Sequence, residues 1–259
     1  MQGDTQGPTA MLAAIPLSLL LFGAVIVTSM ISGVFGMAGG LVLMLILVQL
    51  FAVPAAMVLH GVTQFVSNGW RALLWRRWID WRIVGLYTLG ALPAIALPFA
   101  VAYVPDKATM LILLGLVPYA ALALPEALKL DATRSSHAVL CGFLVAGTQL
   151  IAGVAGPLLD VFFVRSVTMD RRAVVATKAT TQALSHTLKV GYYLSLAAAG
   201  TALDWDVYTA AIAAALIGTT LAGPILEKIS NANFRKWTKV IVLIVGSISI
   251  AQGLWLLLS

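Results

Sequence analysis

Charged residues are scarce in this chain. Only 10% of its 259 residues are charged, whereas 61% are hydrophobic. A soluble globule of this size needs a much larger polar surface, so the composition excludes a soluble fold and predicts a membrane-embedded one. Apolar stretches of about 18 residues or more recur along the sequence, and a helix of about 20 residues crosses a bilayer core.

Cysteine is rarer still. Cys141 is the single cysteine, which excludes a disulfide framework, a thiolate metal cluster and a CxxC redox pair. The hydrolase signatures HExxH and GxSxG are absent, and so is a pair of aspartates inside an apolar segment. We therefore expect no enzyme, no metal and no cofactor. The 16 basic residues outnumber the 10 acidic ones, but in a membrane protein this excess reports orientation and does not indicate nucleic acid.

Hydrophobic runs divide the chain into two series of five elements. The first series is expected near 13–35, 40–52, 54–77, 82–103 and 107–125. The second follows a polar stretch at 126–136 and is expected near 137–155, 157–165, 172–199, 207–227 and 238–258. The sequence thus predicts an all-α, polytopic transmembrane bundle. In each series the second element is too short to span comfortably and follows a glycine-containing break, so both elements are interpreted as half-helices.

Basic residues mark one side of the predicted membrane protein, because cytoplasmic loops collect Lys and Arg. Thirteen of them can all face that side: Arg71, Arg76, Arg77, Arg82, Lys129, Arg134, Arg165, Arg171, Arg172, Lys228, Arg235, Lys236 and Lys239. The opposite connections hold Lys107 with three aspartates, at 106, 204 and 206. We therefore expect a multi-pass protein of the cell inner (plasma) membrane with both termini outside.

Short matches relate the two series. GVFG at 33–36 matches GVAG at 153–156, TQFVS at 63–67 matches TQALS at 181–185, and the Asp-Trp pair at 80–81 recurs at 204–205. The matches keep their order and fall in elements of the same rank. With five passes in each half, the second half starts on the opposite side of the membrane. The sequence therefore predicts two inverted-topology repeats in one membrane domain, residues 13–127 and 137–258.

The third element of each series carries a stripe of polar side chains. Residues 54–77 contain His60, Thr63, Gln64, Ser67, Asn68 and Arg71, and residues 172–199 contain Lys178, Thr181, Gln182, Ser185, His186 and Lys189. At about 100° per residue, this spacing places each set on one helix face. A polar face inside a bilayer must contact protein or water. The two stripes hold bases and histidines but no carboxylate, which favours an anion as ligand.

We expect the two stripes to face each other near the membrane midplane and to bind a small oxyanion. The glycine breaks would present helix N-termini to the same ligand, although a plain tight turn is the alternative. The predicted substrate-binding residues are His60, Gln64, Ser67, Asn68, Lys178, Gln182, Ser185, His186, Lys189, Gly39, Gly40 and Gly156. The Ser and Thr side chains could instead serve as packing contacts between helices.

Three residues are candidates for proton coupling: His60, His186 and Asp160. The histidines are candidates because imidazole titrates near physiological pH. Asp160 has two other interpretations. It could pair with Arg165 near the membrane edge, which we favour slightly, or with a buried lysine.

The motifs also resemble a known family. The glycine-rich break at 33–40, the polar helix after it, the Asp80-Trp81 turn and their repetition at 153–205 resemble the sulfite exporter TauE/SafE family, also called 4-toluene sulfonate uptake permeases. The resemblance covers nearly the whole chain. It implies a carrier of sulfite, sulfonates or related oxyanions, with proton coupling. The second break departs from the pattern, because GVAGPLLD lacks the glycine run of GMAGG.

The sequence therefore predicts a secondary transporter of a small organosulfur anion that works by alternating access. An anion channel and a membrane assembly factor without transport are the alternatives. The expected partners are the anionic substrate and the lipid bilayer, with no nucleic acid, and a homodimer is left open. The sequence does not settle which anion moves, in which direction, or with which coupling ion.

Overall fold

The computed structural model describes residues 17–125, 128, 130–163, 169–196, 203–229 and 231–259, and within these ranges it is helical without strands. The first half holds α2 (Leu17–Phe35), α3 (Ala38–Leu50), α4 (Val53–Leu74), α5 (Trp81–Val101) and α6 (Lys107–Ala123), with the short helix η1 (Arg76–Trp78) before α5. The second holds α7 (Ser135–Ala152), α8 (Gly156–Phe163), α9 (Arg171–Leu196), α10 (Trp205–Lys228) and α11 (Asn231–Leu258).

Each predicted segment corresponds to one of these helices, and the all-helical fold class is confirmed. The predicted residues 13–16, 164–165 and 197–199 lie outside the described ranges. The largest difference is at α11, which was expected to start at 238 and starts at Asn231. No glycine or proline stands between Asn231 and Gly246 to end a helix, so the helix extends beyond its apolar part into a basic turn.

The two short helices form hairpins with the helices before them. Gly39 at the start of α3 packs against the backbone of α2, where an added Cβ would lie 2.0 Å from the Thr28 oxygen. In the second half, the Ala132 N–H donates to the oxygen of Phe162 over 2.9 Å, so the end of α8 lies beside the segment that leads into α7. Each hairpin therefore returns toward the side on which it began.

The helices pair in a pattern that is unchanged when the two halves are exchanged. The first helix of each half packs on the fourth helix of the other, as α2 with α10 and α7 with α5. The third helices pack on each other, α4 with α9, and so do the fifth, α6 with α11. Each pair contains a glycine whose Cβ would overlap the partner helix, a small-residue contact typical of membrane helices: Gly33, Gly142, Gly61 and Gly115.

Each glycine break contains one glycine with a positive φ angle. Gly36 and Gly153 both have positive φ, +69° and +77°, and α3 and α8 begin two and three residues later. By this backbone criterion GMAG at 36–39 corresponds to GVAG at 153–156. The sequence match of GVFG at 33–36 with GVAG at 153–156 pairs Gly33, and not Gly36, with the turn-forming Gly153.

The most apolar helices surround the two polar ones. Among the described residues, five helices are long and apolar enough to cross a membrane: α2, α5, α7, α10 and α11. The polar helices α4 and α9 lie against each other in the bundle, and their stripes are buried except for Arg71 and Lys178, which are partly exposed. Because protein covers both stripes, the lipid meets mainly apolar side chains.

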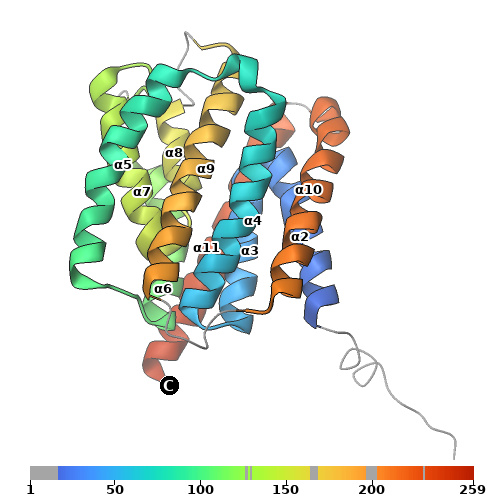
Figure 1. Cartoon of the computed structure of the whole chain (residues 1–259), viewed down its shortest axis with the longest axis vertical. Helices are drawn as coiled ribbons and strands as arrows, with labels where there is room; N and C mark the ends of the chain where they lie inside the picture. Colours follow the sequence, from blue (N-terminus) through green and yellow to red (C-terminus); the bar gives the residue numbers. More distant parts are fainter. Residues whose placement is uncertain (1–16, 126–127, 129, 164–168, 197–202, 230) are drawn as a thin grey trace, which may run out of the picture.

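The connections differ in charge between the two ends of the bundle. The α4–α5 turn, which carries several of the predicted basic residues, lies at the same end as the α10–α11 turn (Figure 1). The start of α2 and the C-terminus lie at the opposite end (Figure 1). Trp81 and Trp205, the tryptophans of the repeated Asp-Trp pair, are 65% and 82% exposed at helix starts, as expected for residues at a membrane interface.

Candidate functional site

The two polar stripes meet along an antiparallel contact between α4 and α9. Gly61 allows this close approach, since a Cβ there would lie 2.5 Å from Cγ2 of Val190 and 3.3 Å from Cε of Lys189. His60, at one end of the α4 stripe, therefore lies beside Lys189, and Arg71, at the other end, lies near Lys178. The predicted facing of the two stripes is present in the structure.

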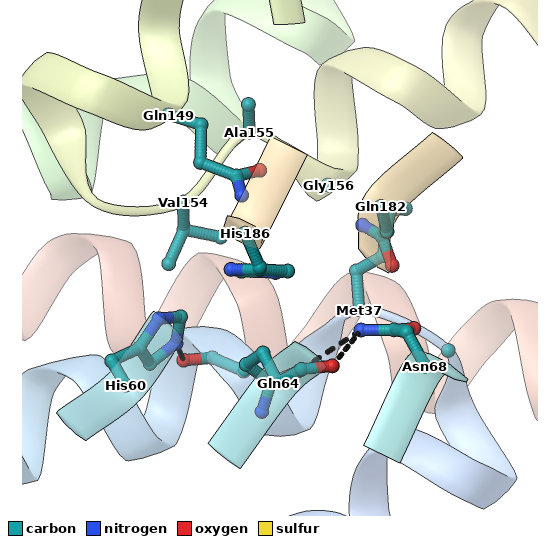
Figure 2. Close-up of a pocket in the computed structure, with 12 residues that line it drawn as sticks. Met37, His60, Gln64, Asn68, Gln149, Val154, Ala155, Gly156, Gln182 and His186 are labelled. Carbon is teal, nitrogen blue, oxygen red and sulfur yellow. Dashed lines mark hydrogen bonds between the residues drawn. The ribbon is translucent and has the colours of Figure 1, made fainter. Parts of the chain in front are cut away.

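A small cavity lies at the middle of this contact. Its volume is about 10 Å³, roughly the space of one water molecule. Figure 2 shows side chains of α4 on one side of it and side chains of α7 and α9 on the other. The lining residues are Gly36, Met37, Gly40, His60, Gln64, Asn68, Gln149, Val154, Ala155, Gly156, Gln182 and His186. None of these residues is acidic.

Three side chains of this lining carry a buried nitrogen without a hydrogen-bond partner among the described residues: Gln64, Gln149 and His186. The first two atoms are amide Nε2 groups, which only donate. The orientation of Gln64 follows from Asn68, whose Nδ2 donates to the Gln64 backbone oxygen over 2.9 Å and approaches Oε1 at 3.5 Å. A buried donor without a partner is destabilising by about 1–3 kcal/mol, so these groups favour a ligand that brings hydrogen-bond acceptors.

The N-termini of both short helices reach the cavity. Met37 and Gly40 at the start of α3, and Ala155 and Gly156 at the start of α8, line it. The first N–H groups of a helix have no partner within the helix, and this end of its dipole is positive. The two starts differ in one respect: α8 has Pro157 in its first turn, which removes one N–H group that α3 retains.

A hydrogen-bonded chain connects the two breaks beside the cavity. His60 Nε2 lies 2.9 Å from the oxygen of Gly40, and Lys189 Nζ lies 3.0 Å from the oxygen of Gly153. Lys189 Nζ also lies 2.7 Å from His60 Nδ1. Because a carbonyl only accepts, Nε2 carries the proton of His60 and a neutral ring accepts from Lys189 at Nδ1. The ring of His186 lies next to this pair, 5.5 Å from the His60 ring between centroids.

The opposite end of the stripes carries a different charged group. Lys178 forms an ion pair with Asp160 of α8, and their side chains are 21% and 29% exposed. The guanidinium of Arg71 lies close enough to Lys178 for the two positive charges to repel. Arg71 Nη2 is buried and has no hydrogen-bond partner among the described residues. The Asp160–Lys178 pair is the second interpretation given above, and Arg165, the slightly favoured partner, lies outside the described residues.

The structure brings together seven of the predicted binding residues at the cavity: His60, Gln64, Asn68, Gln182, His186, Gly40 and Gly156. The other five do not line it. Lys178 and Lys189 have the partners described above, and Gly39 packs on α2. Ser67 bonds to Thr219 over 2.7 Å, and Ser185 bonds to Tyr87 over 2.6 Å, so both hydroxyls join neighbouring helices.

Five lining residues were not predicted: Gly36, Met37, Gln149, Val154 and Ala155. Four of them belong to the breaks and contribute backbone or apolar surface, for which composition gives no signal. Gln149 had a usable signal. It is a polar residue four positions before Gly153, in the largely apolar second half of its helix, and this places it one helical turn from the break.

Comparison with known proteins identifies one family. A family model described as sulfite exporter TauE/SafE matches residues 21–248, nearly the whole chain. Neither a curated protein nor a solved structure matches the chain. The match confirms the resemblance that the motifs indicated. The family is one of membrane transporters, in agreement with the apolar helices and with the expectation that the chain is not an enzyme.

Proposed function

Because the chain belongs to the sulfite exporter TauE/SafE family, we propose that it is a secondary transporter that moves sulfite, a sulfonate or a related organosulfur oxyanion across the cytoplasmic membrane. The anion binds between α4 and α9, in the cavity lined by the two stripes and the two breaks. The observation that carries this proposal is the set of unpartnered buried nitrogens of Gln64, Gln149 and His186 in a lining without acids.

A small oxyanion suits these groups chemically. Sulfite and sulfonate present several acceptor oxygens on one compact headgroup, and the cavity offers amide and imidazole nitrogens together with two helix N-termini. Hydrogen bonds to an ionised acceptor are about twice as strong as those between neutral groups. A carboxylate would also accept them, so the number and arrangement of oxygens would decide between anions.

The size of the cavity favours a carrier over an open channel. Room for about one water does not admit a sulfite ion, so the helices must move apart before the anion binds. The two ends of the stripes also differ in exposure. Lys189 is 0% exposed, whereas Lys178 is 21% exposed. In alternating access, the exposed end and the buried end of the stripes would change places. The helix pairs support such a motion, because the pairing stays the same when the two repeats, residues 13–127 and 137–258, are exchanged.

The proposal also includes coupling of transport to protons. His60 and Lys189 face each other through two nitrogens that cannot both act as donors, so the pair in this geometry holds at most one positive charge. Binding of an anion beside it favours that charge, and release of the anion favours loss of the proton. His186, next to both, provides a further proton acceptor. Asp160, the third candidate, lies at the other end of the stripes in its ion pair with Lys178.

A thermal-shift panel tests the substrate class. The purified protein is heated with sulfite, thiosulfate, taurine, sulfoacetate or an aromatic sulfonate, because a ligand that binds only the folded state raises Tm. We expect at least one of these anions to stabilise the protein, and to do so less in a Gln64→Leu variant. Stabilisation by a cation or a simple carboxylate, with no shift from any member of the panel, would contradict the proposal.

A further inference from the structure

Lys178 pairs with Asp160, and Arg71 lies close enough to Lys178 for their charges to interact. This charged cluster lies outside the cavity, near the end of α4 and the start of α9, where the basic connections are. We propose that this cluster is a docking site for the transported oxyanion, at which the anion replaces Asp160 as the partner of Lys178 before it moves to the cavity. This inference rests on the proposed function and adds a second anion site to it.

The charge of the cluster favours an anion. It contains two cations from facing helices and one carboxylate, so one positive charge has no counterpart within it. Arg71 Nη2 is buried and unpartnered among the described residues, although a guanidinium normally binds a carboxylate or another oxyanion through two parallel hydrogen bonds. An oxyanion between Arg71 and Lys178 would satisfy the free guanidinium nitrogen and balance the excess charge.

The cluster is accessible, unlike the group at the other end of the stripes. The side chains of Lys178 and Asp160 are 21% and 29% exposed, whereas His60 and Lys189 are 1% and 0% exposed. Part of the Lys178–Asp160 pair therefore lies at the protein surface, and in this proposal the anion reaches it there. Partly exposed ion pairs are weak, so an incoming anion can compete with Asp160 for Lys178.

The cluster is also continuous with the cavity. Lys178 lies four residues before Gln182 on the same face of α9, about 6 Å along the helix. Arg71 lies seven residues after Gln64 on the same face of α4, about 10 Å along it. An anion that leaves Lys178 thus meets the amide of Gln182 one helical turn further on.

The test is the KM for sulfite, measured separately from each face of the protein in oriented proteoliposomes. Asp160→Asn frees Lys178, and we expect it to lower KM on the basic face severalfold. Arg71→Gln removes the guanidinium that would donate charge-assisted hydrogen bonds to the anion, and we expect it to raise KM on the same face about tenfold. KM on the opposite face should change little in both variants. Arg77→Gln, an exposed substitution at the same end, is the matched control and should leave both values unchanged.

A purely structural role for the cluster would alter yield or maximal rate without changing KM on one face alone. Lys178→Gln leaves Asp160 unpaired and could fail to fold, so the double variant Lys178→Gln with Asp160→Asn replaces it, with an expected rise in KM on the basic face. If the wild type transports saturably and KM is unchanged in the Asp160→Asn and Arg71→Gln variants, the docking site is contradicted and the proposed function is not. A wild-type protein that transports no anion of the panel contradicts the proposed function, and the docking site with it.

Discussion

Nζ of Lys189 lies 2.7 Å from Nδ1 of His60, and both side chains are buried between the glycine breaks of the two halves. Among the described residues, no carboxylate pairs with this lysine. An ionised lysine at membrane depth is destabilising by at least about 2.5–3.5 kcal/mol on insertion scales. An ionisable residue at this depth is therefore a candidate functional group, and an anion that arrives with its own negative charge is the partner that the proposed function supplies.

The first prediction concerns Lys189 itself. Lys189→Met keeps a side chain of similar length but removes the buried charge together with its hydrogen bonds to His60 and Gly153. We expect sulfite flux to fall at least about tenfold, because the positive charge next to the anion is lost. We expect Tm to be unchanged or higher, because removal of the charge offsets the lost hydrogen bonds.

Both quantities can be followed on one preparation, by flux in proteoliposomes and by thermal unfolding in detergent. Lys236→Met makes the same substitution at an exposed position of α11 and serves as the control. Full flux in Lys189→Met would show that this lysine serves packing alone.

The second prediction separates binding from stability at Gln149. Its Nε2 atom is buried without a partner among the described residues, so Gln149→Leu removes an unsatisfied donor worth about 1–3 kcal/mol. We expect the ligand-free variant to melt a few degrees higher than the wild type and to gain less Tm from sulfite. Gln252→Leu, outside the cavity, should keep the full sulfite shift. An undiminished shift in Gln149→Leu would remove this residue from the site.

The third prediction tests the contact between the two breaks. A Cβ on Gly156 would lie 2.4 Å from both Cβ and Sδ of Met37. Gly156→Ala should therefore push the starts of α3 and α8 apart, lower stability by about 1–3 kcal/mol and weaken anion binding. The matched control is Gly69→Ala in α4, where an added Cβ meets nothing within 4 Å and which we expect to be neutral or slightly stabilising. Equal melting and equal anion binding in the two variants would contradict the packing described here.

The fourth prediction concerns orientation. We expect the basic connections to face the cytoplasm, with both termini outside. In a Cys141→Ser background, a single cysteine introduced at Ser259 should react with an impermeant maleimide in right-side-out vesicles. A cysteine introduced at Arg77, in the connection between α4 and α5, should react only after the membrane is opened. The reverse pattern would invert the topology and place the docking cluster on the outer face.

The sequence predicted the helices well because hydrophobic length and glycine breaks are local signals. It also predicted the facing of α4 and α9, since a polar stripe inside a bilayer has few alternatives to a polar neighbour. The sequence left open whether Ser67 and Ser185 bind the ligand or join helices, because the answer depends on where Thr219 and Tyr87 of other helices lie. Their hydroxyls occupy the edges of the stripes, where a third helix is within reach.

Two further features depended on tertiary structure. The pairing of Asp160 with Lys178 follows from the return of α8 toward the start of α7, and the sequence left open whether this short helix spans the membrane or returns. The backbone angles were also needed to identify which glycine forms the turn in the second break, since Gly153 and Gly156 match the first break equally well by sequence identity. In both cases the sequence named the correct residues but did not determine their partners.

The most direct test of the central claim is saturable uptake of radiolabelled sulfite into proteoliposomes that contain the purified protein, compared with a Gln64→Leu and Gln182→Leu double variant. Both glutamines line the cavity from facing helices, and their replacement removes donors without adding charge. We predict saturable flux in the wild type and flux at the level of protein-free liposomes in the folded double variant. Equal flux in the two proteins would contradict an anion site between α4 and α9.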